Sequence, residues 1–554
     1  MKLISKSIFV LALGATTVLT SCIDEVTPTT VATQDMVEHS ASSQTAMLYG
    51  IPSAMLTVNT DYHFWFGYSS MMVIRDCLTA DVVRDQGTGY DNFWSWEQNA
   101  YMGRDYNRAS YTWNYYYDLI NAANNVISSV NPEESTEEQL GILGAALAYR
   151  ALAYTDLAQM YEVKANDILP ETDGKILNSK GNDIKGLTVP IITEETTEEQ
   201  SHNTPRATRD EIFAFIENDL LNAVQYLPGL TLSDRTFPHL DCAYGLLARL
   251  YLWHGDYAKA YAAAINAIDN ATTNFMTRST ALNTTSGFNT ASDFMWAGQF
   301  SKENRAVTSG IINWTSWMSN ETFFGYAGAG GVWVEIDANL YHKISDTDWR
   351  KLMWKAPEGT ALEGQTPFID SDWGESMPEY SSVKFRPGQG EMSDYSVSAS
   401  VAFPVMRVEE MVFIAAEAAA RTQGPAAGLA FLTDFMHACR DESYNSNAST
   451  LDEVIEEIIL QKRIELWGEG QTFFDIKRLN MPVTRGYTGS NHDPSFQFNT
   501  TTFPGWMNLV IPRNEENNNG ATIDYATPDP SDKYTPWGSE ETRCMFPRRV
   551  LKLK

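Results

Sequence analysis

The feature that most constrains the fold is a long helical period in the stretch EQLGILGAALAYRALAYTDLAQMYE, residues 138–162. Its apolar and aromatic side chains recur every three or four residues, as they do along one side of an α-helix. They are Leu140, Leu143, Leu147, Ala151, Tyr154, Ala158 and Tyr161. This spacing predicts one long helix with a single buried stripe.

A second stretch, residues 241–270, predicts two helices joined at His254, Gly255 and Asp256. Small residues at Ala260, Ala264 and Ala267 would let the two backbones approach closely. The pair resembles a tetratricopeptide repeat, although Tyr244, Ala264 and Thr272 depart from that pattern. Residues 209–228, 406–423, 428–441 and 449–470 also carry helical period, the last with a capping residue at Ser449 or Thr450 and a stop at Gly468 or Gly470.

Together these segments predict an all-α fold: a tetratricopeptide-repeat-like helical scaffold with a large, loop-rich, irregular ligand-binding region. The loop-rich insertions fall at about residues 270–400 and 481–545, within one domain that spans 41–554. Long loops of this kind tend to carry function. Hydrophobic residues make up 43% of the chain and charged residues 20%, which is typical of a globular protein. The formal charge of -30 opposes binding to nucleic acid, because phosphates must be neutralised by Lys and Arg.

The first 21 residues read as a signal peptide, with a basic start, an apolar run and the sequence Leu19-Thr20-Ser21-Cys22. These four residues resemble a bacterial lipobox, in which the cysteine is acylated and becomes the new N-terminus. Cys22 is therefore the predicted lipidation site, and residues 22–40 a lipidated tether to a membrane. The alternative is an ordinary secretory signal with a chance cysteine. The other four cysteines are widely spaced, so the sequence predicts neither a disulfide framework nor a zinc site.

Motifs for enzymatic chemistry do not occur: there is no G-x-S-x-G, P-loop, H-E-x-x-H or EF-hand loop. The sequence predicts no cofactor and no metal site, with structural Ca²⁺ left open by the acidic composition. A glycosidase-type pair of carboxylates stays open too, because the separation that defines such a pair is spatial.

Six further segments, in this order, resemble the SusD/RagB family of outer-membrane lipoproteins. They are WNYYYDLINAANNVI (113–127), AYRALAYTDLAQMYE (148–162), PRATRDEIFAFIENDLLNAVQYLP (205–228), MRVEEMVFIAAEAAAR (406–421), ILQKRIELWGEGQTFFDIKRLN (459–480) and NLVIPRNEENNN (508–519). Gln461 and Gln471 depart from the family pattern. The charges within these segments, Glu417, Glu469, Asp475 and Arg478, read as structural partners of helix ends.

The resemblance implies a non-catalytic protein at the outer membrane, lipid-anchored and facing the cell exterior. Members of the family capture oligosaccharides and hand them to a SusC-like TonB-dependent transporter. Three alternatives stay open: a peptide-capturing member of the same family, a helical-repeat scaffold that binds only a protein partner, and an enzyme.

Two aromatic and polar regions are candidates for glycan contact, since sugar rings stack on flat side chains and hydrogen-bond to short polar ones. The first contains Trp65, Asp81, Arg84, Trp94, Trp96, Asn99 and Tyr101; the second contains Trp314, Trp317 and Tyr326. Asp81 and Arg84 are assigned by the resemblance of TADVV to a family segment that precedes the ligand loop. The choice between Trp94 and Trp96 is open, and each ring has the alternative of anchoring a packed loop.

Overall fold

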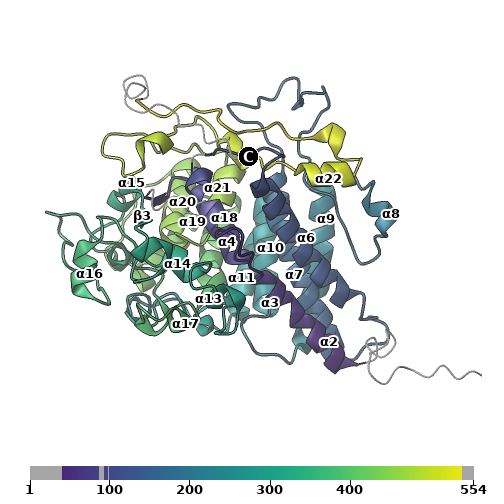
Figure 1. The fold of residues 1–554 in the computed structure, drawn as a ribbon, viewed down its shortest axis with the longest axis horizontal. Coiled ribbons are helices and arrows are strands. Elements are labelled where there is room, and N and C mark those ends of the chain that lie inside the picture. The colour runs from purple at the N-terminus through teal and green to yellow at the C-terminus, as the bar shows by residue number, and fades with distance from the viewer. Residues whose placement is uncertain (1–39, 86–92, 98, 539–554) are drawn as a thin grey trace, which may run out of the picture.

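The computed structural model describes residues 40–85, 93–97 and 99–538. The predicted signal peptide, the lipidation site Cys22 and nearly all of the tether lie outside these ranges. One half of the molecule is a stack of long helices, and the other is built from short helices, strands and loops (Figure 1).

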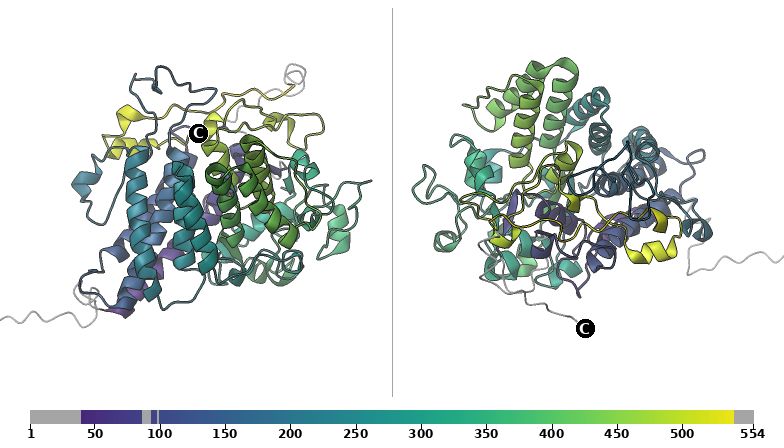
Figure 2. Two further views of the ribbon diagram at one scale, coloured as in Figure 1. Left: turned by 180° about the vertical axis from the view of Figure 1, so that it is seen from behind. Right: turned by 90° about the horizontal axis from the view of Figure 1, so that it is seen from above.

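The long helices follow one another in an antiparallel array. α6 packs on α7, α7 on α9, α9 on α10, α10 on α11, α11 on α18 and α18 on α19 (Figures 1 and 2). The main helices are α2 (Ala41–Leu48), α3 (Gly50–Met55), α6 (Asn107–Ile127), α7 (Glu137–Tyr161), α9 (Arg209–Tyr226), α10 (Leu240–His254), α11 (Tyr257–Asn270), α18 (Val408–Gln423), α19 (Pro425–Cys439) and α20 (Leu451–Glu465). This array confirms the predicted all-α, repeat-like scaffold.

Local sequence sets where these helices begin and end. The side chains of Thr136, Thr208 and Thr450 each accept a hydrogen bond from the backbone N–H three residues later. The Gln or Glu side chain at that later position accepts a hydrogen bond from the threonine backbone N–H, which completes a capping box. The predicted turn between α10 and α11 is confirmed, with Gly255 in the left-handed region at φ 93°. α20 ends at Glu465, a few residues before the predicted glycine stop.

The prediction of a single buried stripe on α7 was wrong. Every residue from Gly141 to Tyr161 is buried, because α2, α6, α9 and α10 pack around the helix. The approach is close: a Cβ on Gly141 would lie 2.2 Å from the backbone nitrogen of Leu230. α7 is therefore the central helix of the scaffold.

The expected loop-rich insertions contain short elements of their own. Within the described residues, two antiparallel strand pairs join the first insertion to other parts of the chain, β1 with β3 and β2 with β4. The shorter elements are β1 (Val82–Arg84), β2 (Trp296–Gln299), β3 (Val334–Ile336), β4 (Ala402–Met406), α4 (Tyr68–Cys77), α5 (Trp94–Glu97), α8 (Glu198–Ser201), α12 (Arg278–Ala281), α13 (Arg305–Thr308), α14 (Trp314–Met318), α15 (Ala338–His342), α16 (Ser371–Ser376), α17 (Tyr395–Ser398), α21 (Thr472–Arg478) and α22 (Arg513–Asn518). The C-terminal segment, yellow in Figure 1, runs across the top of the helices.

Ion pairs in the interior hold α18, α20 and α21 together. The guanidinium of Arg407 contacts the carboxylates of Glu409, Glu465 and Glu469 at 2.9–3.1 Å. Arg478 pairs with Glu417 at 2.7 Å and with Asp475 at 2.8 Å. These contacts confirm the structural interpretation of the family-like charges. No helix among the described residues is long and apolar enough to cross a membrane.

Candidate functional site

The two aromatic regions that the sequence singles out lie side by side. β1 from the first region pairs with β3 at the end of the second, with Val82 opposite Ile336 and Arg84 opposite Val334. The pairing continues past the strands, because the backbone N–H of Asp85 donates to the carbonyl of Trp333 at 3.2 Å. Residues about 250 positions apart in the chain therefore meet at a buried junction.

A buried layer of rings lies next to this junction. Trp317 and Tyr326 stack in parallel at 3.9 Å, and the Arg84 guanidinium donates to the Trp317 carbonyl at 3.0 Å. The indole N–H of Trp317 donates to the His63 carbonyl at 2.9 Å, and the His63 ring bonds to the Tyr326 hydroxyl. Trp317 is fully buried, and Arg84 and Tyr326 are nearly so. The structure brings these three predicted residues together in the core, where they anchor the segments around them.

On one side of this layer lies a stack of three rings, Tyr62, Trp65 and Tyr111, which we call the Trp65 cluster. Trp65 stacks on Tyr111 at 4.3 Å and on Tyr62 at 4.6 Å between ring centroids. Tyr62, at the outer end, is 37% exposed. A pocket of about 550 Å³ opens here, with polar walls from Asn59, Asp61, Asn114, Asp118 and Arg305. An aromatic ring beside amide, carboxylate and guanidinium groups is the combination that a sugar needs.

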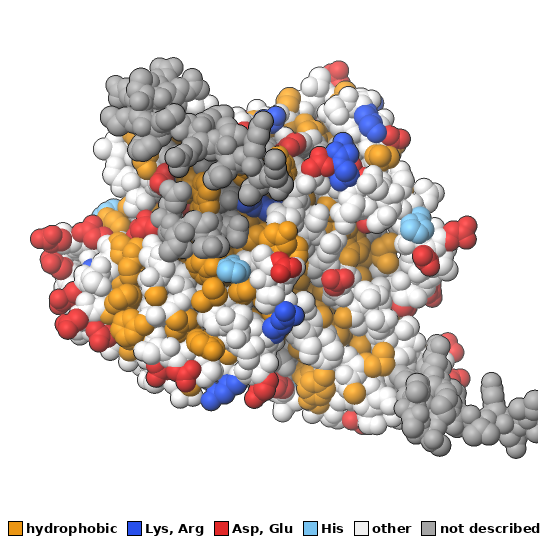
Figure 3. Space-filling view, viewed as in Figure 1, with side chains coloured by type: hydrophobic (Ala, Val, Ile, Leu, Met, Phe, Trp, Pro, Cys, Tyr) orange, Lys and Arg blue, Asp and Glu red, His pale blue; other side chains and the backbone are white. Residues whose placement is uncertain are grey.

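On the other side lie Phe323, Trp333 and Trp373, which we call the Trp373 cluster. The rings of Phe323 and Trp373 meet edge to face at 5.0 Å between centroids, and those of Trp333 and Trp373 lie tilted to each other at 5.9 Å. The indole N–H of Trp373 donates to the Asn320 carbonyl at 2.9 Å, which fixes the ring. Phe323 is 50% exposed, and the two tryptophans are half-buried. Hydrophobic side chains gather over this half of the face, with carboxylates along its rim (Figure 3).

Three other predicted site residues lie in the core. Trp96 is 1% exposed, with the Arg108 guanidinium over its ring, and Trp314 packs against Phe385 and Phe403. Asn99 is also buried. Because protein covers the faces of both tryptophans, neither ring offers a stacking surface in this structure.

The carboxylate of Asp81 is committed to the scaffold as well. It accepts two hydrogen bonds from Arg463 Nε, at 3.0 and 3.2 Å, and a shorter one from Nη2. Its carbonyl accepts from the Trp467 indole at 2.7 Å. Asp81 is 1% exposed, so this side chain holds α20 against the start of β1.

The remaining two predicted residues reach the surface. Trp94 is half-buried and stacks on Phe496 at 5.9 Å. Tyr101 is 52% exposed, pairs edge to face with Tyr106, and has φ of 58°. A left-handed backbone is costly for tyrosine, and such strain concentrates at functional sites.

Sequence reasoning did not select the exposed rings of Tyr62 and Phe323, although both lie within the two predicted regions, and it did not consider the half-buried ring of Trp373. Tyr62 and Phe323 are single rings within stretches that are rich in rings, and period alone does not tell which ring is covered. Trp373 lies 50 positions beyond Phe323, so nothing in the local sequence connects them. Their exposure follows only from packing.

Two carboxyl groups at the strand pair have raised pKa values. Burial, aided by the nearby charge of Asp85, raises the pKa of Glu335 to about 8, and Asn491 donates to it at 3.0 Å. Burial and the charge of Asp493 raise the pKa of Asp85. Within the ranges that the structure covers, no group of three His, Cys, Asp or Glu side chains is placed to hold a metal ion.

The fold and the surface define a class: a helical-repeat binding protein whose irregular half presents aromatic rings. A family described as starch-binding and associating with the outer membrane matches residues 66–252, and the SusD family matches residues 296–543. The chain belongs to the SusD/RagB family.

Solved structures agree with this fold. A SusD-like carbohydrate binding protein from Bacteroides vulgatus is 22% identical, with a TM-score of 0.67, over 88% of this chain and 98% of that one. A SusD superfamily protein from Bacteroides thetaiotaomicron is also 22% identical, with a TM-score of 0.64, over 87% and 98%. One from Bacteroides fragilis is 19% identical, with a TM-score of 0.61, over 87% and 99%. A search of curated proteins found no match.

Proposed function

We propose that this protein is a non-catalytic glycan-binding lipoprotein that captures oligosaccharides at the cell surface. The observation that carries the proposal is the pair of ring clusters beside short polar side chains. Tyr62 offers an exposed ring next to a pocket with Asn59, Asp61 and Arg305, and Phe323 offers a second. Two separated stacking points suit a chain of sugars, because each ring needs only one sugar face.

Capture would be the first step of uptake. Acylated Cys22 would hold the protein on the outer membrane, and the acidic residues Asp24 and Glu25 just after it resemble the export signal of surface lipoproteins. The protein would then act as a lid over a SusC-like TonB-dependent transporter and deliver the glycan to it. Co-purification of such a transporter with the full-length lipoprotein from detergent-solubilised membranes tests this partner.

Affinity gel electrophoresis against a panel of polysaccharides tests glycan binding. We expect retardation by the cognate glycan and about tenfold weaker binding in the Tyr62→Ala/Phe323→Ala variant, since two stacking contacts are lost. The Tyr49→Ala/Tyr525→Ala variant is the matched control, because it removes two exposed rings from other surfaces.

Two outcomes contradict these assignments. Equal retardation of the Tyr62→Ala/Phe323→Ala variant and the wild type would refute the two ring clusters as the binding site. Absence of retardation by every glycan, with peptides co-purifying instead, would favour the peptide-capturing alternative.

A further inference from the structure

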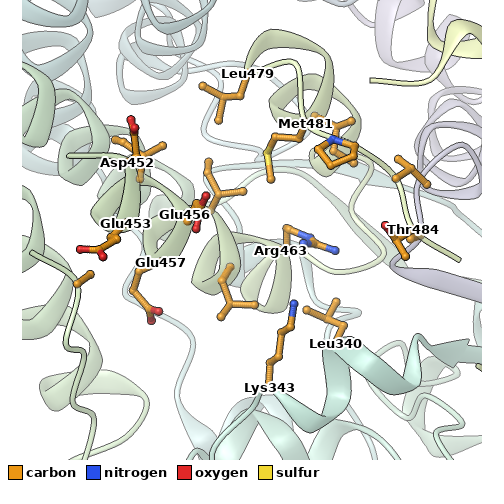
Figure 4. Close-up of a pocket in the computed structure, with 18 of the residues that line it drawn as sticks. Leu340, Lys343, Asp452, Glu453, Glu456, Glu457, Arg463, Leu479, Met481 and Thr484 are labelled. Atoms are coloured by element: carbon orange, nitrogen blue, oxygen red, sulfur yellow. The ribbon is translucent and has the colours of Figure 1, made fainter. Parts of the chain in front are cut away.

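A cavity of about 1140 Å³ lies along the outer side of α20, and the proposed glycan site does not use it. Its walls come from α20, from α15 and the residues just after it, and from residues 479–484 (Figure 4). Among the described residues that line the cavity, the one aromatic ring is that of Tyr257, and the Arg421 guanidinium lies over it at 4.7 Å. The cavity therefore lacks an open ring for a sugar to stack on.

One end of the cavity is acidic. Asp452 and Glu456 lie one helical turn apart on α20, are exposed, and form no side-chain hydrogen bond or ion pair with the rest of the described chain. Like charges at this spacing repel each other. Neighbouring Glu453 completes the capping box, and Glu457 accepts a hydrogen bond from the Tyr444 hydroxyl, so these two carboxylates already have hydrogen-bond partners. A cation bound at Asp452 and Glu456 would relieve their repulsion.

The other end carries two cations, while the Asp337 carboxylate there is buried and already accepts hydrogen bonds from the Tyr487 hydroxyl and the Leu340 backbone. Arg463 uses Nε and Nη2 for Asp81, which leaves Nη1 without a hydrogen-bond partner among the described residues. Lys343 is exposed, and its ammonium likewise forms no ion pair within the described part of the chain. Figure 4 shows Lys343 and Arg463 on the opposite side of the cavity from Asp452. This end suits a carboxylate.

The floor between the two ends is apolar. Ile455 and Ile459 of α20 are buried, and Leu460 of α20 and Leu479 and Met481 of the facing segment are half-buried. From position 452 to position 463 the helix rises about 16 Å. An extended polypeptide covers that distance with about five residues.

We propose that this cavity binds an extended segment of another polypeptide, about five residues long. The segment carries Lys or Arg at the Asp452 and Glu456 end, apolar side chains over the floor, and a carboxylate at the Lys343 and Arg463 end. Opposite charges at the two ends fix the direction in which the segment lies. The assignment is independent of glycan binding.

Fluorescence anisotropy with a labelled, end-capped peptide Lys-Leu-Val-Leu-Asp tests the proposal on the purified full-length protein. We expect saturable binding that weakens as salt is added, because the charges are exposed. The Asp452→Asn/Glu456→Gln variant should bind this peptide about fivefold more weakly. The Lys343→Gln variant should also bind the charged peptide more weakly than the wild type.

Two controls isolate the charges. The neutral peptide Gln-Leu-Val-Leu-Asn should bind wild type and the Asp452→Asn/Glu456→Gln variant equally, and the Glu198→Gln/Glu199→Gln variant, with two exposed glutamates of α8 neutralised, should match wild type. Absence of saturable binding of the charged peptide up to about 2 mM would overturn the proposal, since that limit corresponds to very weak association. Equal affinity of the charged peptide for wild type and the Asp452→Asn/Glu456→Gln variant would overturn it as well.

Discussion

Val83 on β1 lies directly opposite Glu335 on β3, and this pairing joins the two aromatic regions of the chain. Three residue pairs make up the ladder, yet it places Trp333 beside Asp85 and brings the Arg84 guanidinium over the ring of Trp317. The ring clusters flank this junction. Much of the candidate site therefore depends on a short strand pair between segments that are distant in sequence.

Stability should depend on pH through Glu335. Its pKa is about 8 in the folded protein against an ordinary 4.5, so the folded state holds a proton that the unfolded chain releases between these values. The stabilisation is complete below about pH 4.5 and is lost as the pH rises toward 8, by at most about 1.4 kcal/mol per pH unit. In Glu335→Gln, the free energy of unfolding measured with urea should change less with pH between about pH 5 and 8.5 than in the wild type. The same slope in Glu335→Gln and wild type would refute this, and Glu134→Gln, an exposed glutamate, serves as the control.

Trp94 and Trp96 should respond differently to truncation. Trp96→Ala removes a fully buried indole and should lower the free energy of unfolding by about 3–5 kcal/mol. Trp94→Ala removes a half-buried ring and should cost less, leaving a folded protein whose glycan retardation can be measured. Chemical denaturation measures the stability loss in both variants, and affinity electrophoresis then measures glycan retardation of Trp94→Ala. Similar stability losses in the two variants would contradict the burial assigned to them.

Arg407 should contribute strongly to the stability of the folded protein. Its removal leaves the carboxylates of Glu409, Glu465 and Glu469 buried with less compensation, which should cost about 3–5 kcal/mol in Arg407→Ala. Urea unfolding measures the loss. Arg278→Ala, at an exposed arginine, should stay within about 0.5 kcal/mol of wild type. A loss in Arg407→Ala as small as that of the control would disprove the role of the network.

Gly255 should resist substitution for a backbone reason. Its φ is 93°, and no atom lies within 4 Å of the position that a Cβ would take, so Gly255→Ala adds backbone strain of about 1 kcal/mol without a clash. Gly50→Ala is the matched control, with equally open space but φ outside the left-handed region, and it should be neutral or stabilising. Thermal unfolding of both variants tests this. Equal melting temperatures of Gly255→Ala and Gly50→Ala would refute the predicted backbone strain.

The helical scaffold could be predicted because its signals are local. The period of 138–162, the small residues of 241–270 and the threonine at 450 each act within a few turns of the chain. The same local view misjudged α7, since a period shows which side of a helix is apolar but not how many neighbours surround it. Gly141 and the many alanines allow helices to close on every side.

The candidate site could be predicted only as a pair of regions. Composition placed rings and polar residues in the right stretches, and family resemblance drew attention to Asp81 and Arg84. Which rings are open was decided by packing: Trp96, Trp314 and Trp317 fill the core, while Tyr62, Phe323 and Trp373 reach the surface.

The sequence by itself determined the helices, their caps and the family, because these depend on residues a few positions apart or on ordered motifs. Only the tertiary structure decided the site. Arg463 reaches Asp81, and β3 reaches β1, across hundreds of residues, and the exposure of a ring depends on what every other segment leaves uncovered.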